Sequence, residues 1–408
     1  MMKRLTALIA ALLLCVPTVL TSAELAGTVS DDYEPLYTFA EPYGFKLGGA
    51  FGFWDMQNKT FMDFLDDHFN SLTCTNETKA YSLLDQKASK KSEDGMPRMN
   101  YDMADKMIAW CQAHGKQVRG HVLVWDAVMQ YPWFFHEDYD ETKPFASAEV
   151  NRARLESDID QVITHFEEKF PGVIYCWDVV NEAIGDSSSD WRADDPRHIR
   201  IVRDGGPNYF QAYVGDDYVE YAFLCARNTV EKLGADIHLF YNDYNMFMTE
   251  KRTAALALLD SINSYAENDN GEFRKLADGI GMQGYLGGYG VQEGCLEDSL
   301  ITDLKASIEM YAAKGYEVQI TEMAVRNFDK NLSDLHAEFY GRLFSEIFMQ
   351  ANREEKILSA VCIWGLVDAP EGKKDYVYKM NSPYGCFLST KYEIKSCFDK
   401  VYHVLKGE

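Results

Sequence analysis

The sequence predicts an α/β protein built as a (β/α)8 TIM barrel in a single domain. Short apolar segments rich in β-branched residues alternate along the chain with longer amphipathic segments. This alternation is typical of parallel strands connected by helices. Eight such units indicate a closed barrel. An open doubly wound sheet is the structural alternative, but no phosphate-binding glycine fingerprint follows the first strand to support it.

The expected elements follow from hydrophobic periodicity. The eight expected strands are Phe45–Phe53, Phe69–Thr75, Gln117–Trp125, Ile174–Val180, His238–Asn242, Gly279–Tyr285, Val318–Thr321 and Ala360–Leu366. The expected helices are Met103–His114, Val150–Phe170, Tyr218–Leu233, Lys251–Tyr265, Leu300–Lys314, Leu335–Ala351 and Cys397–Leu405. Residues 24–43 are expected to be an irregular lead-in, so the barrel domain would occupy residues 44–408.

Charge limits the partners that this protein can have. The chain carries 64 Asp and Glu against 40 Lys and Arg, a net charge of −24. Such a surface repels nucleic acid and anionic membranes. It suits a neutral polymer as the binding partner.

The N-terminus is typical of a secretory signal peptide, predicted to cover residues 1–23. Lys3 and Arg4 form a positive start, Leu5–Leu20 is an apolar core, and small residues at Thr21–Ala23 offer a cleavage site. An uncleaved membrane anchor is the alternative, but the apolar run is short for a membrane span. We therefore expect a secreted, extracellular protein that is cleaved near Ala23.

Nine cysteines are present, and eight remain after the predicted cleavage. Most lie in apolar strand-like or helix-like runs, where buried thiols are more common than disulfides. Cys386 and Cys397 flank a possible hairpin and are the best disulfide candidates. No CxxC or HExxH spacing suggests a catalytic metal.

Two glutamates follow apolar strands at the places where a barrel positions catalytic groups. The run Ile174–Val180 is apolar apart from Asp178 and leads directly into Asn181 and Glu182. A second short apolar strand leads into Glu322. Two carboxylates facing each other across the top of a barrel are what glycoside hydrolysis requires. For Glu182 taken alone, a structural ion pair at the barrel rim is the alternative.

Several motifs in order resemble glycoside hydrolase family 10, the endo-β-1,4-xylanase family of retaining (β/α)8 barrels. The resemblance covers roughly residues 44–405. The motifs are Thr75-Asn76-Glu77-Thr78-Lys79, Arg119-Gly120-His121-Val122-Leu123-Val124-Trp125, Trp177-Asp178-Val179-Val180-Asn181-Glu182-Ala183, Asn242-Asp243-Tyr244-Asn245, Gly281-Met282-Gln283-Gly284, Ile320-Thr321-Glu322 and Ile363-Trp364-Gly365.

The resemblance implies a role for each matching position. Glu182 resembles the family's general acid/base, Glu322 its nucleophile, and Asn181 the residue that hydrogen-bonds the sugar 2-hydroxyl. The positions that would hold sugars on the non-reducing side are Asn76, Lys79, His121, Trp125, Gln283 and Trp364. These types suit the task, since aromatic faces stack on sugar rings and amides bond to hydroxyls.

Three departures from the family pattern bear on the substrate. Thr75 stands where the family usually has Glu against a distal sugar, and Asp126 where it often has His. Trp364 is the last tryptophan in the chain, whereas the family usually has a further one that roofs the site. Tyr376 or Tyr378 is expected to substitute for it.

Two further departures occur together. Tyr285 replaces a family histidine, and Ala324 replaces the aspartate that holds that histidine. We interpret Tyr285 as a substitute hydrogen-bond donor to the nucleophile: a phenol stays neutral over the working pH range and needs no aspartate to fix a tautomer. The alternative is that Tyr285 turns away to stack on a sugar or to pack in the glycine-rich loop.

The resemblance thus implies a secreted retaining endo-β-1,4-xylanase that needs no cofactor and binds xylan, and we expect a monomer. A retaining β-1,4-glycanase or glycosidase acting on arabinoxylan or β-glucan is the nearest alternative. A carbohydrate-binding barrel that has lost hydrolysis is the alternative of a different class.

Overall fold

The computed structural model describes residues 33–126, 130–186, 193–200, 208–286, 298–371 and 382–408. Parallel strands form a closed eight-stranded barrel, in which β10 pairs with both β9 and β1. In order around the barrel the strands are β1 (Lys46–Phe51), β2 (Ser71–Cys74), β3 (Gln117–Gly120), β5 (Ile174–Asn181), β6 (His238–Asp243), β7 (Gly279–Met282), β9 (Glu317–Val325) and β10 (Leu358–Ile363). The predicted (β/α)8 fold is confirmed.

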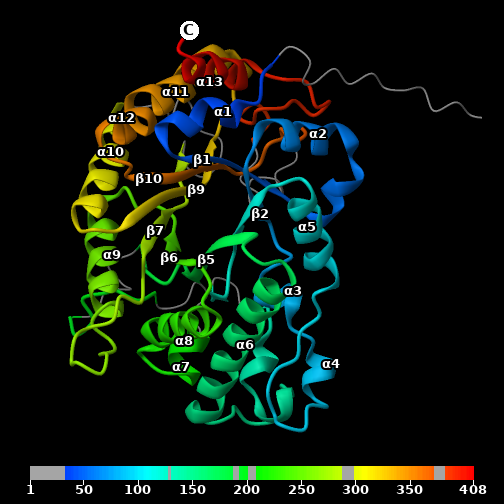
Figure 1. The fold of residues 1–408 in the computed structure, drawn as a ribbon, viewed down its shortest axis with the longest axis vertical. Helices are drawn as coiled ribbons and strands as arrows, with labels where there is room; N and C mark the ends of the chain where they lie inside the picture. The colour runs from blue at the N-terminus through cyan, green and yellow to red at the C-terminus, as the bar shows by residue number, and fades with distance from the viewer. Residues whose placement is uncertain (1–32, 127–129, 187–192, 201–207, 287–297, 372–381) are drawn as a thin grey trace, which may run out of the picture.

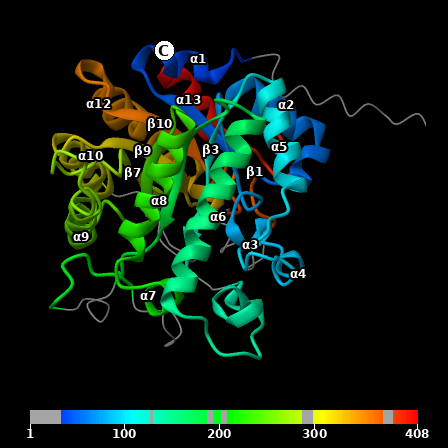
Figure 2. The same ribbon diagram turned by 60° about the horizontal axis from the view of Figure 1, so that its bottom comes forward.

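Helices surround the strands (Figures 1 and 2). The longer ones are α2 (Lys59–His68), α5 (Asp102–Ala113), α6 (Ala148–Lys169), α8 (Tyr218–Leu233), α9 (Thr249–Ile262), α10 (Asp298–Ala313), α11 (Ser333–Arg342) and α13 (Ser396–Lys406). A π-helical turn, η6 (Leu343–Phe348), joins α11 to α12 (Met349–Glu354), so the single helix expected over Leu335–Ala351 is interrupted.

Short helical segments occupy the loops between these elements. They are η2 (Phe53–Gln57), α3 (Ala80–Leu83), α4 (Gln86–Ser89), η3 (Pro132–Phe135), η4 (Glu137–Tyr139), α7 (Tyr209–Tyr213) and η5 (Lys330–Leu332). The segments α3, α4 and α7 gather at one end of the molecule, and α13 lies at the other (Figures 1 and 2). The end that carries α3, α4 and α7 holds the loops that follow β2 and β5, where a barrel builds its active site.

Two expected strands are each divided in two. After β3 the chain leaves the ladder at residues 121–123 and returns as β4 (Val124–Trp125), which pairs with β5. Gly284 separates β7 from β8 (Tyr285–Leu286); its φ of +77° lies in the left-handed region, which glycine adopts readily. The strand β9 runs past Glu322 to Val325, so this glutamate lies within a strand and not at its end.

Two further expectations differ from the structure. Part of the expected irregular lead-in is helical, as α1 (Leu36–Ala40) and η1 (Glu41–Tyr43), because Leu36 and Ala40 are buried. Cys386 and Cys397 form no disulfide: both are buried free thiols, and Cys397 Sγ donates to the carbonyl oxygen of Cys386 (3.1 Å).

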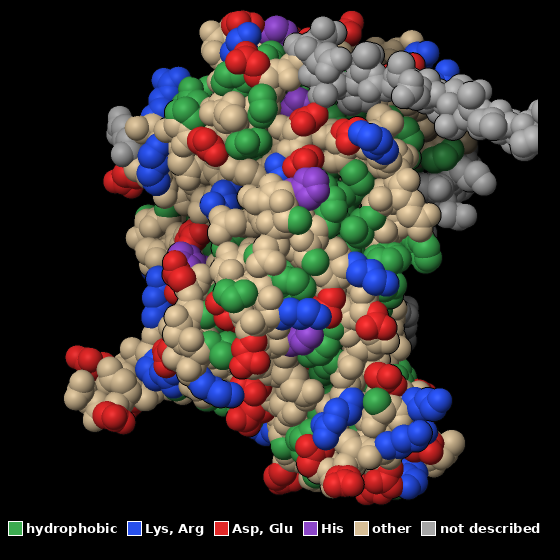
Figure 3. Space-filling view, turned by 45° about the vertical axis from the view of Figure 1, so that its right-hand side comes forward, with side chains coloured by type: hydrophobic (Ala, Val, Ile, Leu, Met, Phe, Trp, Pro, Cys, Tyr) green, Lys and Arg blue, Asp and Glu red, His purple; other side chains and the backbone are tan. Residues whose placement is uncertain are grey.

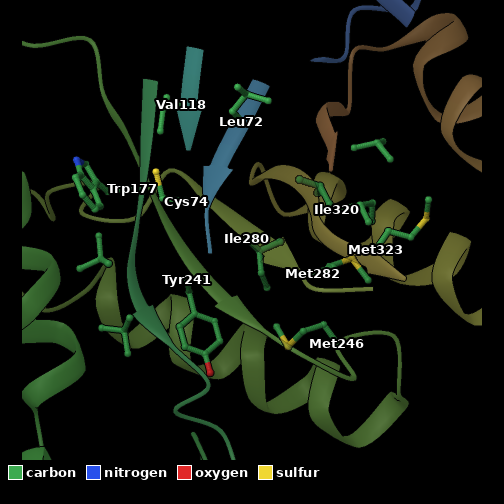
Figure 4. Packing of buried hydrophobic residues seen from close by; sticks show 14 of the residues in the cluster. Leu72, Cys74, Val118, Trp177, Tyr241, Met246, Ile280, Met282, Ile320 and Met323 are labelled. Carbon is green, nitrogen blue, oxygen red and sulfur yellow. The ribbon is translucent and has the colours of Figure 1, made fainter. Parts of the chain in front are cut away.

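The barrel interior combines apolar packing with one buried charge cluster. Figure 4 shows side chains of the apolar core, among them Leu72, Val118, Ile280 and Ile320 from four different strands. Arg119 and Asp178 are both fully buried and form two hydrogen bonds at 2.7 and 3.0 Å. Arg119 Nε also donates to Gln319 of β9 (2.6 Å). A buried charge pair with its remaining donors satisfied links β3, β5 and β9 below the site.

Candidate active site

Backbone hydrogen bonds bring the ends of four neighbouring strands together. The Glu182 N–H donates to Asn242 O (2.9 Å), the Gln283 N–H to Asp243 O (3.0 Å), and the Glu322 N–H to Gln283 O (2.9 Å). The register of β5 and β6 places Asn181 beside Asn242. The two glutamates singled out in the sequence therefore reach one site from β5 and β9.

Glu182 is held by donors from two other strands. Trp125 Nε1 donates to Oε2 (3.2 Å), and Gln283 Nε2 donates to Oε1 (3.0 Å). The backbone of Glu182 has a φ of +54°, an uncommon conformation for a residue with a side chain. Such strain persists only when the surroundings over-determine it, and it is common at functional sites.

Glu322 is 4% exposed and has its own donors. Asn242 Nδ2 donates to Oε1 (3.0 Å), and the Tyr285 hydroxyl donates to Oε2. His121 Nε2 lies 3.9 Å from Oε1. Tyr285 is paired with Ala324 across β8 and β9, so the two positions that depart together from the family pattern are direct neighbours.

Buried amides connect the two carboxylates. Asn242 Nδ2 donates both to Glu322 and to Asn181 Oδ1 (2.9 Å), and Gln283 Nε2 donates both to Glu182 and to Asn181 (3.2 Å). The Thr321 hydroxyl donates to Asn242 Oδ1 (2.6 Å) and so fixes the orientation of that amide. The two carboxylates are therefore linked through shared amide donors, which limits how far either can move.

Asn76, Lys79 and Trp125 lie together beside the carboxylates. Lys79 Nζ is 3.5 Å from Asn76 Oδ1 and 4.7 Å from the centre of the Trp125 ring. Asn76 is exposed, whereas Lys79 is buried. Burial lowers the pKa of Lys79, although Glu322 and Glu182 oppose this shift. A desolvated ammonium near two carboxylates is a strong donor for a hydroxyl group.

His121 and Trp364 form the other wall. His121 is buried, and its Nδ1 is 2.8 Å from Asp178 Oδ2. Arg119 and the His121 hydrogen bond outweigh the effect of burial and hold the pKa of Asp178 below its usual value. The rings of His121 and Trp364 meet edge to face at 5.8 Å. The structure thus brings Asn76, Lys79, His121, Trp125, Asn181, Gln283, Tyr285 and Trp364 together around the pair of glutamates.

Sequence reasoning did not assign a role to two residues of this site. Asn242, which contacts Glu322, begins the motif Asn242-Asp243-Tyr244-Asn245. Its position near the end of β6 could have indicated a role in the site. Arg200, whose Nη1 lies 3.9 Å from Glu182 Oε2, had no signal, because it follows β5 by a long loop. Tyr376 and Tyr378, expected to replace the missing tryptophan, lie outside the described residues.

The surface shows acidic and basic side chains interspersed on one face (Figure 3). Among the described residues, no cluster of three or more His, Cys, Asp and Glu has the arrangement of a metal site. The same part of the chain contains no helix long and apolar enough to cross a membrane.

The fold and the site define a class: a (β/α)8 barrel that brings one glutamate from β9 and one from directly after β5 into one site, held among amides and aromatic rings, is a glycoside hydrolase. The model of glycosyl hydrolase family 10 matches residues 36–404, and the chain belongs to this family.

Relatives of known name agree with this assignment. The chain is 30% identical over 386 residues to endo-1,4-beta-xylanase B of Butyrivibrio fibrisolvens, covering 91% of this chain but 53% of that protein. It is 27% identical to endo-1,4-beta-xylanase A of Caldicellulosiruptor saccharolyticus, covering 82% of this chain and 86% of the relative. The xylohexaose complex of Clostridium thermocellum endo-1,4-beta-D-xylanase 10B superposes with a TM-score of 0.75 at 25% identity, over 91% of this chain and 67% of that one.

We expect Asp126 to make the stability of the protein depend on pH. Burial raises the pKa of Asp126 to about 7, although Tyr209 N–H donates to Oδ2 (2.7 Å) and Arg200 lies nearby. A raised carboxyl pKa means that the unfolded chain ionises first, so stability is lost as pH rises from about 4 to about 7. Asp126→Asn should therefore be more stable than the wild type at pH 8, with little difference at about pH 4.

Urea unfolding at the two pH values measures this difference. The matched control is Asp303→Asn on α10, whose side chain is exposed. This control should change the free energy of unfolding only slightly, and by the same amount at both pH values. If the free energies of unfolding of the wild type and of Asp126→Asn differed by the same amount at both pH values, the raised pKa of Asp126 would be contradicted.

Proposed function

We propose that the protein is a secreted retaining endo-β-1,4-xylanase that hydrolyses internal xylosidic bonds of xylan by double displacement. The observation that carries the proposal is the amide network that holds Glu182 and Glu322 in one site. The printed names of the relatives support the substrate class. We also propose that the chain is a monomer and that residues 1–23 are removed near Ala23, which N-terminal sequencing of secreted protein would test.

Glu182 is the general acid/base in this proposal and Glu322 is the nucleophile. Glu182 protonates the glycosidic oxygen while Glu322 attacks the anomeric carbon and forms a covalent glycosyl-enzyme. Glu182 then takes a proton from water, whose oxygen displaces Glu322. The donors on Glu322 favour its charged form, which a nucleophile requires. The hydrogen bonds from Trp125 and Gln283 fix Glu182 in place for both proton transfers.

The remaining residues position the sugar chain. Asn181 bonds the sugar 2-hydroxyl in this proposal, which its hydrogen bonds to the amides that contact both carboxylates support. Lys79 and Asn76 offer an ammonium and an exposed amide to hydroxyl groups, and Trp125 and Trp364 offer aromatic faces. The further positions proposed to hold sugars are His121 and Gln283.

A reducing-sugar assay on xylan, arabinoxylan, cellulose and mixed-linkage β-glucan tests the function. Release of sugar mainly from xylan supports the proposal. Preference for arabinoxylan or β-glucan would favour the rival suggested by Thr75, which departs from the family pattern. Binding of xylan without release would favour the carbohydrate-binding barrel.

The two glutamates should differ in their dependence on the leaving group. Glu322→Ala should abolish turnover on every substrate, because no other group forms the covalent intermediate. Glu182→Ala should lower the rate on xylan far more than on an aryl xyloside, whose leaving group needs little protonation. Azide should restore turnover of the aryl xyloside by the Glu182 variant, because it replaces the activated water.

Steady-state kinetics on both substrates provide the measurement. Glu317→Gln is the matched control, since this residue lies on the same strand as Glu322 but at its other end. It should keep wild-type turnover. Equal losses on xylan and aryl xyloside for Glu182→Ala would refute its role as the acid.

Tyr285→Phe tests the hydrogen bond to the nucleophile. The variant should fold normally, lose kcat/KM, and move the acidic limb of its pH profile to higher pH, because the charged carboxylate loses a donor. A hydrogen bond to a charged group is worth about 1.5–3 kcal/mol, or roughly ten- to a hundred-fold in rate.

Full pH profiles of kcat/KM measure this effect. Tyr311→Phe removes another buried hydroxyl, which donates to Met246 O (3.0 Å) away from the site; it should leave the acidic limb in place. If Tyr285→Phe behaved like Tyr311→Phe, the tyrosine would have no part in holding the nucleophile.

A further inference from the structure

Arg200 is a buried arginine beside Glu182. It is 6% exposed, and its Nη2 donates to Ile184 O (2.9 Å) while its backbone N–H donates to Ala183 O (2.7 Å). Its Nη1 is buried without a hydrogen-bond partner and lies 3.9 Å from Glu182 Oε2. A buried guanidinium nitrogen without an acceptor is unfavourable, so its retention next to a carboxylate needs a reason.

Other acidic groups near Arg200 have closer partners of their own. Lys251 Nζ pairs with Asp243 (2.8 Å) and with Asp186 (2.7 Å). Asp126 accepts the Tyr209 N–H (2.7 Å). Within the described part of the chain, the carboxylate oxygen that lies within 4.0 Å of this guanidinium belongs to Glu182.

Glu182 changes charge during the proposed reaction. It is neutral before the glycosidic oxygen takes its proton, and it is ionised in the glycosyl-enzyme until it takes a proton from the attacking water. Among the described residues, Lys79 and Asp243 interact electrostatically with it, and Glu322 lies in the same site. Arg200 brings a further cation to this carboxylate, since its Nη1 lies 3.9 Å from Oε2.

We propose that Arg200 is a positioning residue that forms a charge-assisted hydrogen bond to Glu182 when Glu182 is ionised. The inference rests on the proposed double-displacement function. Charge-assisted hydrogen bonds between nitrogen and oxygen are about 2.7–2.9 Å long, so Oε2 and Nη1 need to approach by about 1 Å. Arg200 thereby makes Glu182 a better proton donor in the first step and holds it in place as the base in the second.

Arg200→Met and Arg200→Lys test this proposal. Removing the cation with Arg200→Met should move the alkaline limb of kcat/KM to higher pH by about one unit, because Glu182 stays protonated longer. With an activated aryl xylobioside, whose turnover is limited by the second step, kcat should fall about tenfold because the base is no longer held. Arg200→Lys keeps a cation and should retain the wild-type limb.

Arg154→Met provides the structural control. Arg154 is also buried and donates to the carbonyl oxygens of Phe134 and His136 (2.6 and 2.9 Å). This control should lower the melting temperature without moving either limb. If Arg200→Met lost stability while both limbs of its pH profile stayed in place, Arg200 would serve only to secure the loop through its hydrogen bond to Ile184 O.

A second measurement needs no variant. The wild type trapped with a 2-deoxy-2-fluoro xylobioside should show Nη1 within hydrogen-bond distance of Glu182 Oε2 in a crystal structure. A separation that stays near 3.9 Å would overturn the proposal. If no sugar were trapped and xylan gave no product, the proposed function itself would fail. If the sugar were trapped but Arg200 had not moved, only the proposal for Arg200 would fail.

Discussion

The site depends on the buried carboxylate of Asp178. This side chain accepts hydrogen bonds from Arg119 and from His121, both carried by the segment that begins with β3. Arg119 in turn bonds to Gln319 of β9, the strand that carries Glu322. One buried charge thus fixes β3, β5 and β9 relative to each other below the carboxylates of Glu182 and Glu322. Three directed hydrogen bonds offset its cost in desolvation.

Much of this architecture is predictable from sequence because periodic burial and strand ends are local properties. The eight strands follow from apolar runs, and Glu182 and Glu322 follow from their place after those runs. The breaks within two predicted strands, at residues 121–123 and at Gly284, were not predictable in the same way. They depend on which backbone hydrogen bonds the neighbouring strand can form, and this cannot be read from a single sequence.

Long-range pairs mark the limit of sequence reasoning in the site. Tyr285 was interpreted as a donor to the nucleophile, and the structure places its hydroxyl on Glu322 with Ala324 as the cross-strand neighbour. Arg200 could not be placed, since its partner lies 18 positions earlier and neither residue has a periodic pattern that links them. The disulfide suggested for Cys386 and Cys397 failed because short spacing says nothing about whether the two sulfur atoms face each other.

The buried thiols have a consequence for the lifetime of this enzyme. Seven described cysteines are free and buried, so none meets solvent while the chain stays folded. Unfolding in an oxidising medium exposes all of them at once, and disulfide formation between wrong partners then competes with refolding. In such a medium the working stability of the protein is governed by the rate at which the barrel opens, and only secondarily by the equilibrium between folded and unfolded chains.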